Sequence, residues 1–97
     1  VRSFITEFEW MRREAGVVTG AVLVLHYLDK PGLLDEITSI QHKHENVIPS
    51  TMHIHLEKNK CLEIIAIRGS VQEVRTLAQD LMTKKGVKQV KVSFIAQ

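Results

Sequence analysis

The sequence predicts an α+β fold in which two helices pack on one face of a four-stranded sheet. Four segments have the apolar patterning of strands and two have helical apolar stripes, in the order strand, helix, strand, strand, helix, strand. Two strand-helix-strand units joined by a hairpin make a ferredoxin-like sandwich, because right-handed crossovers put both helices on the same side of the sheet. The composition, 97 residues of which 44% are hydrophobic, suits one such domain.

A Pro-Gly turn joins the first strand to the first helix of this sandwich. Residues 17–27 are apolar on both faces, which is typical of a central strand. The turn contains Asp29, Pro31 and Gly32, residues that favour turns. The helix after it ends near residues 44–46 and carries an apolar stripe of Leu33, Leu34, Ile37 and Ile40.

Residues 50–57 and 61–68 are predicted to form the hairpin. Ser70 and Glu73 then have the spacing of a capping box, which predicts that the second helix begins there. The last strand covers residues 87–95. The first and third strands then lie in the middle of the sheet. We expect a second copy of the chain to cover their other apolar face.

Residues 1–16 precede the sandwich. Phe4, Phe8 and Met11 have helical spacing, and Gly16 can end a helix. We expect residues 1–16 to be a helix and linker left from a preceding domain, and residues 17–97 to be the folded domain.

Charge and cysteine content exclude several classes of function. The net charge of +2 has no long single-sign block, so residues 1–97 offer no nucleic-acid-binding surface of their own. Cys61 is the only cysteine, which favours a reduced intracellular setting. The sequence shows no signal peptide or membrane span, so we expect a cytoplasmic protein without a membrane partner. It shows no nucleophile-and-base pair or phosphate loop, so we do not expect an enzyme.

The hairpin brings possible metal ligands together. Its even-numbered positions are predicted to form the core face, so His53 and His55 point the other way. A register that matches the apolar residues of both strands also places Cys61 and Glu63 beside the histidines. This register requires a loop with an odd number of residues, most simply three. Imidazole and thiolate donors suit nickel, copper or zinc. His53, His55 and Cys61 therefore predict a transition-metal site. The alternative is that the histidines are solvated on an edge strand and Cys61 packs as a small apolar residue.

Three further polar residues have predicted places, and His26 stays unassigned. His42 lies opposite the core stripe of its helix and could reach the site of a partner, while His44 lies in line with that stripe. Glu63 is expected to orient a ligand rather than bind the metal. His26 has no predicted partner.

The residues Gln41-His42, His53-x-His55 and Cys61-Leu62-Glu63, followed by Gly69 and Lys85-Gly86-Val87, closely resemble the nickel-responsive regulator family NikR over about residues 17–95. The resemblance implies an ACT-type regulatory domain that assembles as a tetramer, a dimer of dimers. It also implies one Ni²⁺ per subunit in a square plane, bound by His53, His55 and Cys61 of one chain and by His42 of a facing chain.

The resemblance further implies a sensor domain of a repressor of nickel uptake. The family carries an N-terminal ribbon-helix-helix domain that binds operator DNA when nickel is bound, and residues 1–14 look like the end of its last helix. Operator DNA is thus expected as a partner of the full-length protein only.

The turn of Asp29, Pro31 and Gly32 departs from this pattern. It looks more like the ligand-binding turn of amino-acid-sensing ACT domains than like the nickel-regulator loop. An amino-acid-binding regulatory module without a nickel role is therefore the alternative function. A Pro-Gly turn that only starts a helix explains the same residues equally well.

Overall fold

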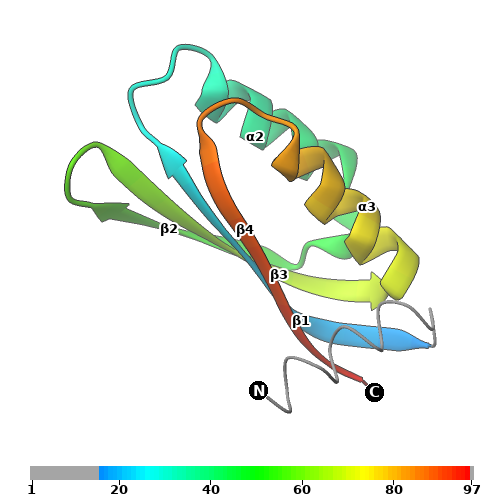
Figure 1. Ribbon diagram of the computed structural model, residues 1–97. Helices are drawn as coiled ribbons and strands as arrows, with labels where there is room; N and C mark the ends of the chain where they lie inside the picture. Colours follow the sequence, from blue (N-terminus) through cyan, green and yellow to red (C-terminus); the bar gives the residue numbers. More distant parts are fainter. Residues whose placement is uncertain (1–15, 97) are drawn as a thin grey trace.

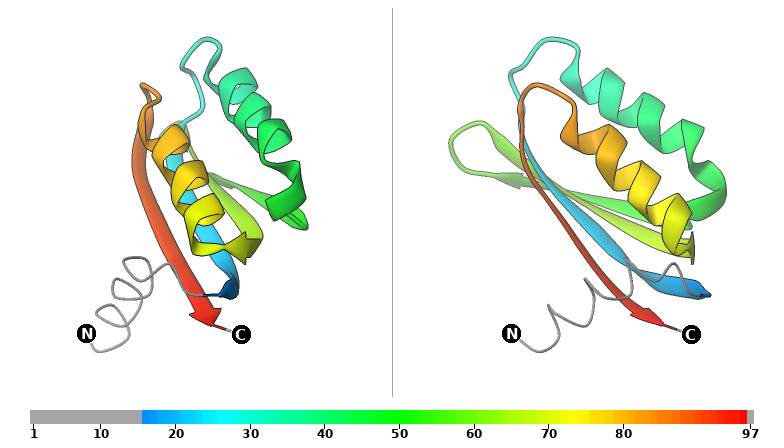
Figure 2. Two further views of the ribbon diagram at one scale, coloured as in Figure 1. Left: turned by 90° about the vertical axis from the view of Figure 1, so that its right-hand side faces the viewer. Right: turned by 45° about the vertical axis from the view of Figure 1, so that its right-hand side comes forward.

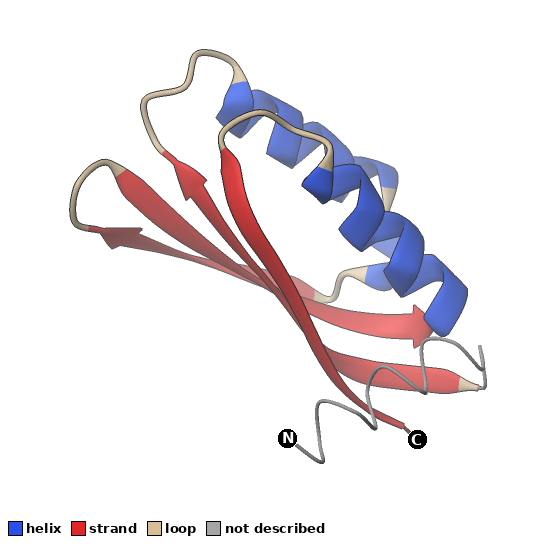
Figure 3. Ribbon diagram, viewed as in Figure 1, coloured by secondary structure: helices blue, strands red, loops and turns tan. Residues whose placement is uncertain are grey.

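In the computed structural model, which describes residues 16–96, one antiparallel sheet carries both described α-helices on the same face (Figure 1, Figure 3). The strand order is β2-β3-β1-β4, so the ferredoxin-like prediction is confirmed. The elements are β1 (Val17–Tyr27), α2 (Leu33–Lys43), the 3-10 helix η1 (Glu45–Val47), β2 (Ser50–Leu56), β3 (Lys60–Ser70), α3 (Val71–Met82) and β4 (Val87–Ala96). The helix predicted at the start of the chain falls on residues 1–15, outside the described part. Among the described residues, no helix is long and apolar enough to cross a membrane.

Both helices begin where the sequence predicts. The Ser70 hydroxyl accepts a hydrogen bond from the Glu73 amide at 3.1 Å, and the Glu73 carboxylate accepts one from the Ser70 amide at 2.9 Å. This reciprocal capping box satisfies two amides at the helix start. At the start of α2, Gly32 has a φ of 79°, a left-handed conformation that glycine adopts without steric cost.

The core lies between the helices and the sheet. Figure 2 shows α2 and α3 side by side over one face of the sheet. Apolar residues of both helices meet residues of the three strands β3, β1 and β4, and all of them are buried: Val18, Val22, Val24, Leu33, Ile37, Ile40, Ile65, Ile67, Val71, Val74, Leu77, Leu81 and Phe94. β2 is an edge strand, as is β4, and every residue of β2 is exposed.

The face of the hairpin that points to the helices is not the predicted one. The prediction that its even-numbered residues form the core face is wrong: Cys61, Glu63 and Ile65 are buried beneath the helices, while Ile64 is only partly buried and Met52 is 59% exposed. β3 is apolar on both faces, so its pattern does not decide which face the helices cover. The relative register of β2 and β3 is unaffected by this reversal.

A hydrogen bond between the helices ties the end of α2 to α3. His44 is buried, as predicted for a packed residue, and its Nε2 donates to the Asp80 carboxylate at 2.9 Å. This hydrogen bond holds the pKa of Asp80 below its ordinary value. The hydrogen bond therefore stabilises the fold fully when the pH is above the ordinary aspartate pKa. This stabilisation is lost as the pH falls through the lowered pKa of Asp80 in the folded chain.

We expect Asp80→Asn to lower the free energy of unfolding by about 1 kcal/mol at neutral pH, because the charged acceptor is lost. Urea unfolding at pH 7 and pH 3 measures this, with Asp29→Asn in the exposed turn as a control. The variant should lose less stability on acidification than the wild type. An equal loss in both would contradict the assignment.

Candidate metal centre

The β2-β3 hairpin is closed by the three-residue loop that the sequence predicts. Leu56 pairs with Lys60, and the loop residues Lys58 and Asn59 have φ values of 62° and 60°. This left-handed backbone allows the tight reversal. The loop length fixes the register, and the register places His53 opposite Glu63 and His55 opposite Cys61.

The three predicted hairpin ligands lie together on one face. Cys61 Sγ is 2.6 Å from His53 Nε2, and the rings of His53 and His55 have centroids 5.0 Å apart. One ligand atom from each of the three residues lies within 4.8 Å of the other two. Cys61 is fully buried, whereas both histidines are exposed. The donors therefore form a patch with a buried sulfur at its base and imidazoles at its rim.

Glu63 contacts one of these histidines and a residue of α2. Its Oε2 accepts a hydrogen bond from His53 Nδ1, and its Oε1 accepts one from Gln41 Nε2 on α2 at 3.5 Å. A carboxylate can only accept, so Nδ1 of His53 carries the proton and Nε2 presents its lone pair beside the sulfur. These contacts support the predicted orienting role of Glu63.

The Cys61 thiol binds its proton tightly in the metal-free chain. Burial raises the pKa of Cys61, and the neighbouring Glu63 carboxylate raises it further. Since a metal binds the thiolate, binding an ion at this site must release the thiol proton. Metal affinity should therefore increase with pH up to the thiol pKa.

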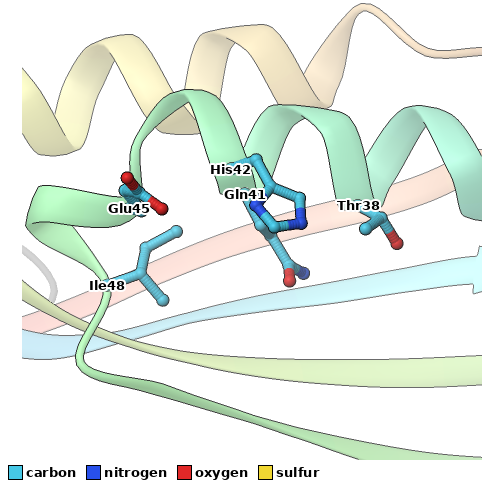
Figure 4. Close-up of a pocket in the computed structure, with 5 residues that line it drawn as sticks. All are labelled: Thr38, Gln41, His42, Glu45 and Ile48. Carbon is cyan, nitrogen blue, oxygen red and sulfur yellow. The ribbon is translucent and has the colours of Figure 1, made fainter.

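His42 lies on α2, away from the hairpin patch. Its side chain is exposed and lines a depression of about 200 Å³ with Thr38, Gln41, Glu45 and Ile48 (Figure 4). Within residues 16–96 the metal-ligand groups of the hairpin do not include His42. Its imidazole thus faces outward, as helix geometry predicts.

His26 is the site residue that sequence reasoning missed. It is 1% exposed and pairs with Cys61 across the β1-β3 ladder. Its Nε2 lies 3.6 Å from Glu63 Oε2, and its Nδ1 lies 3.0 Å from the Tyr27 carbonyl oxygen. The available signal was the alternation of β1, which puts His26 on the same face as Val22 and Val24.

The predicted effector turn lies at the other end of α2. Asp29, Pro31 and Gly32 are exposed, and a cavity of about 500 Å³ beside the turn is bordered by Lys30, Lys84 and Lys85 among others. Binding of an amino acid there stays a prediction.

The chain is similar to nickel-responsive regulators. Residues 19–95 match the family described as the NikR C terminal nickel binding domain. A nickel-responsive regulator of Methanothrix thermoacetophila is 38% identical over 96% of this chain and 66% of its own length. Nickel-responsive regulator 3 of Methanosarcina acetivorans is 38% identical over 99% of this chain and 69% of its own length. The chain thus spans about two thirds of these relatives.

Solved structures share the fold at low sequence identity. The ACT domain of GTP pyrophosphokinase from Chlorobium tepidum is similar with a TM-score of 0.66 and 19% identity, over 76% of this chain and 95% of that one. An uncharacterized protein from Thermotoga maritima has a TM-score of 0.70 and 15% identity, over 80% of this chain and 98% of that one. At these identities the likeness shows the ACT-like fold alone.

Proposed function

The chain belongs to the family of the NikR C-terminal nickel-binding domain, and we propose that it is the nickel-sensing module of a metal-dependent transcriptional repressor. The family consists of regulators, so the chain is not an enzyme. In this proposal residues 17–97 sense the metal and drive assembly. As a further part of the proposal, residues 1–16 connect this module to a ribbon-helix-helix domain, and operator DNA is bound by the full-length protein.

The donor set of the hairpin supports a nickel site. Two imidazole nitrogens and one thiolate are ligands that nickel(II) accepts in a square plane. His53 presents Nε2 because Glu63 holds its Nδ1 proton, and Cys61 supplies a sulfur shielded from solvent. Clustering of His53, His55 and Cys61 in one patch is the observation that carries the proposal.

The fourth ligand is proposed to be the partner subunit's His42. The hairpin supplies three donors, and a square plane requires four. His42 of the same chain is exposed and stands outside the cluster, so its imidazole is available to a facing protomer. Each subunit would then hold one Ni²⁺ through three of its own residues. Bound nickel would supply a fixed link between two protomers.

The sheet face that neither described helix covers supports assembly into a homo-oligomer. Both described helices lie on the opposite face, so half-buried and exposed apolar residues of three strands form a continuous surface: Leu23, Leu25, Met52, Ile54, Leu62 and Ile64. A second copy can bury this surface symmetrically. Together with the metal-linked contact it would give a dimer of dimers. Nickel could then favour one arrangement of the attached DNA-binding arms.

We expect His42→Ala to remove the link between protomers while leaving the hairpin donors in place. Nickel affinity should fall by about tenfold or more, because one of four ligands is lost. Isothermal titration calorimetry measures this, and light scattering shows whether nickel still changes the assembly. Thr38→Ala, which alters the same depression without removing an imidazole, is the control. Unchanged nickel binding and assembly in His42→Ala would exclude the cross-subunit ligand.

We expect Glu63→Gln to lower the pKa of the Cys61 thiol in the metal-free chain. The substitution removes the charge repulsion that raises the pKa, while the larger effect of burial remains, so the pKa should stay above its ordinary value. Thiolate absorbance followed against pH measures the shift. Glu57→Gln, in the exposed turn, should have no effect. A thiol pKa unchanged by Glu63→Gln would contradict the coupling.

A further inference from the structure

A second group of metal-ligating residues lies deeper than the hairpin patch and includes His26. One ligand atom each from His26, Cys61 and Glu63 lies within 4.8 Å of the others, and all three residues are buried. We propose that these residues form an inner metal position for an ion that prefers tetrahedral coordination, such as zinc or cobalt(II). The inference rests on the proposed role of Cys61 as a metal ligand.

Strand register places the inner position next to the outer one. Cys61 lies between His26 on β1 and His55 on β2, because β3 pairs with both strands. Glu63 lies beside it on the same face, opposite His53. The two donor sets therefore share Cys61. The inner set lies toward the central strand β1, and the outer set lies toward the edge strand β2.

The surroundings of His26 favour a bound cation. The Tyr27 carbonyl oxygen can only accept, so the Nδ1 of His26 carries the ring proton and the Nε2 carries a lone pair. That Nε2 is buried and has no hydrogen-bond partner within the described residues. It faces the Oε2 of Glu63, another atom with lone pairs. Two such atoms buried face to face repel each other, and a metal ion bound to both, like a proton on the imidazole, removes that repulsion.

The spacing of these atoms suits two ligands of one ion. The 3.6 Å between His26 Nε2 and Glu63 Oε2 is too long for a hydrogen bond. Ligand bonds of about 2.0–2.1 Å in a tetrahedron put neighbouring ligand atoms roughly 3.4 Å apart, close to this separation. With the Cys61 sulfur they form a nitrogen, oxygen and sulfur set from one chain.

The shared sulfur makes the two positions mutually exclusive. An ion at the inner position takes the Cys61 thiolate and leaves His55 and the partner subunit's His42 unused. Such an ion would occupy the protein without linking protomers. The inner position therefore gives the chain a way to distinguish tetrahedral ions from nickel by their effect on assembly.

Titration with Co²⁺ alone tests the inner position, because tetrahedral cobalt-thiolate sites have intense visible bands. The wild-type chain should bind one Co²⁺ with this spectrum. In His26→Gln the bands should disappear and Co²⁺ affinity should fall by about tenfold or more, while the nickel spectrum is kept. The matched variant His55→Ala should show the reverse: cobalt bands kept and the nickel spectrum lost.

Three results would overturn the inner position: no tetrahedral cobalt spectrum in the wild type, cobalt bands unchanged in His26→Gln, or cobalt bands lost in His55→Ala. If nickel still gives a thiolate charge-transfer band, only this inference fails. If neither ion gives one, the proposed nickel site fails as well. Should His26→Gln not fold, ¹⁵N-histidine NMR of the wild type decides: Zn²⁺ should move the His26 Nε2 resonance to a metal-bound position, and an unmoved resonance refutes the proposal.

Discussion

Replacing Cys61 with serine is expected to abolish the thiolate-to-nickel charge-transfer band and to weaken nickel binding by more than about 100-fold. Loss of a residue that only hydrogen-bonds to a metal ligand weakens metal binding by up to about 100-fold, and loss of the ligand itself should cost more. A serine hydroxyl is a far poorer ligand than a thiolate and keeps its proton at neutral pH. Because Cys61 is the only cysteine, no other thiol can give the band. Absorbance during nickel titration measures both quantities.

Thr51→Ser is the control for this experiment. Thr51 lies on β2, two residues before His53, and its substitution leaves every proposed donor in place. It should bind nickel like the wild type. A Cys61→Ser variant with the wild-type spectrum would contradict the sulfur ligand.

Replacing Leu23 with aspartate is expected to leave the fold intact and to abolish association through the open sheet face. Leu23 is half-buried on the central strand β1 and pairs with Ile64 on that face. Burying an unpaired carboxylate in an apolar interface costs free energy. A symmetric interface contains the substitution twice, once from each protomer, so association should weaken by more than roughly 100-fold. Analytical ultracentrifugation measures the change, and circular dichroism confirms the fold.

Leu34→Asp is the matched control, since Leu34 is 51% exposed on α2, on the helix side of the sheet. Its oligomeric state should be that of the wild type. If Leu23→Asp also kept the wild-type mass, the open face would not be the interface.

The clustering of the candidate ligands could be predicted from the sequence because strand alternation has a period of two. Matching the apolar residues of β2 and β3 determined that His53 and His55 share a face with Cys61 and Glu63, and a three-residue loop completed the register. None of this needed knowledge of the neighbouring helices. The same local logic predicted the capping box at Ser70.

The choice of buried face could not be predicted in this way. β3 presents Ile65 and Ile67 on one face and Leu62 and Ile64 on the other, and only the crossover geometry decides which face the helices cover. Because the helices cover the face that carries Cys61, the sulfur is buried. This burial raises the pKa of the thiol.

The partner of His26 cannot be predicted from the sequence for a related reason. Its contacts depend on the register between β1 and β3, which are separated by a helix and another strand. No short loop fixes that register, so the pairing of His26 with Cys61 could not be read from local pattern. His42 is different: helix periodicity predicted its exposure, and its proposed role depends on a second chain.

Cross-complementation of two variants tests most directly whether the nickel site is shared between chains. His42→Ala keeps an intact hairpin, and His55→Ala keeps an intact His42. Each variant alone should lack the square-planar nickel spectrum. Unfolded together and refolded, they should recover about a quarter of the wild-type signal, because about half of the pairs are mixed and each mixed pair holds one complete site. No recovery on mixing, or a wild-type spectrum in His42→Ala alone, would contradict a site completed by the partner subunit's His42.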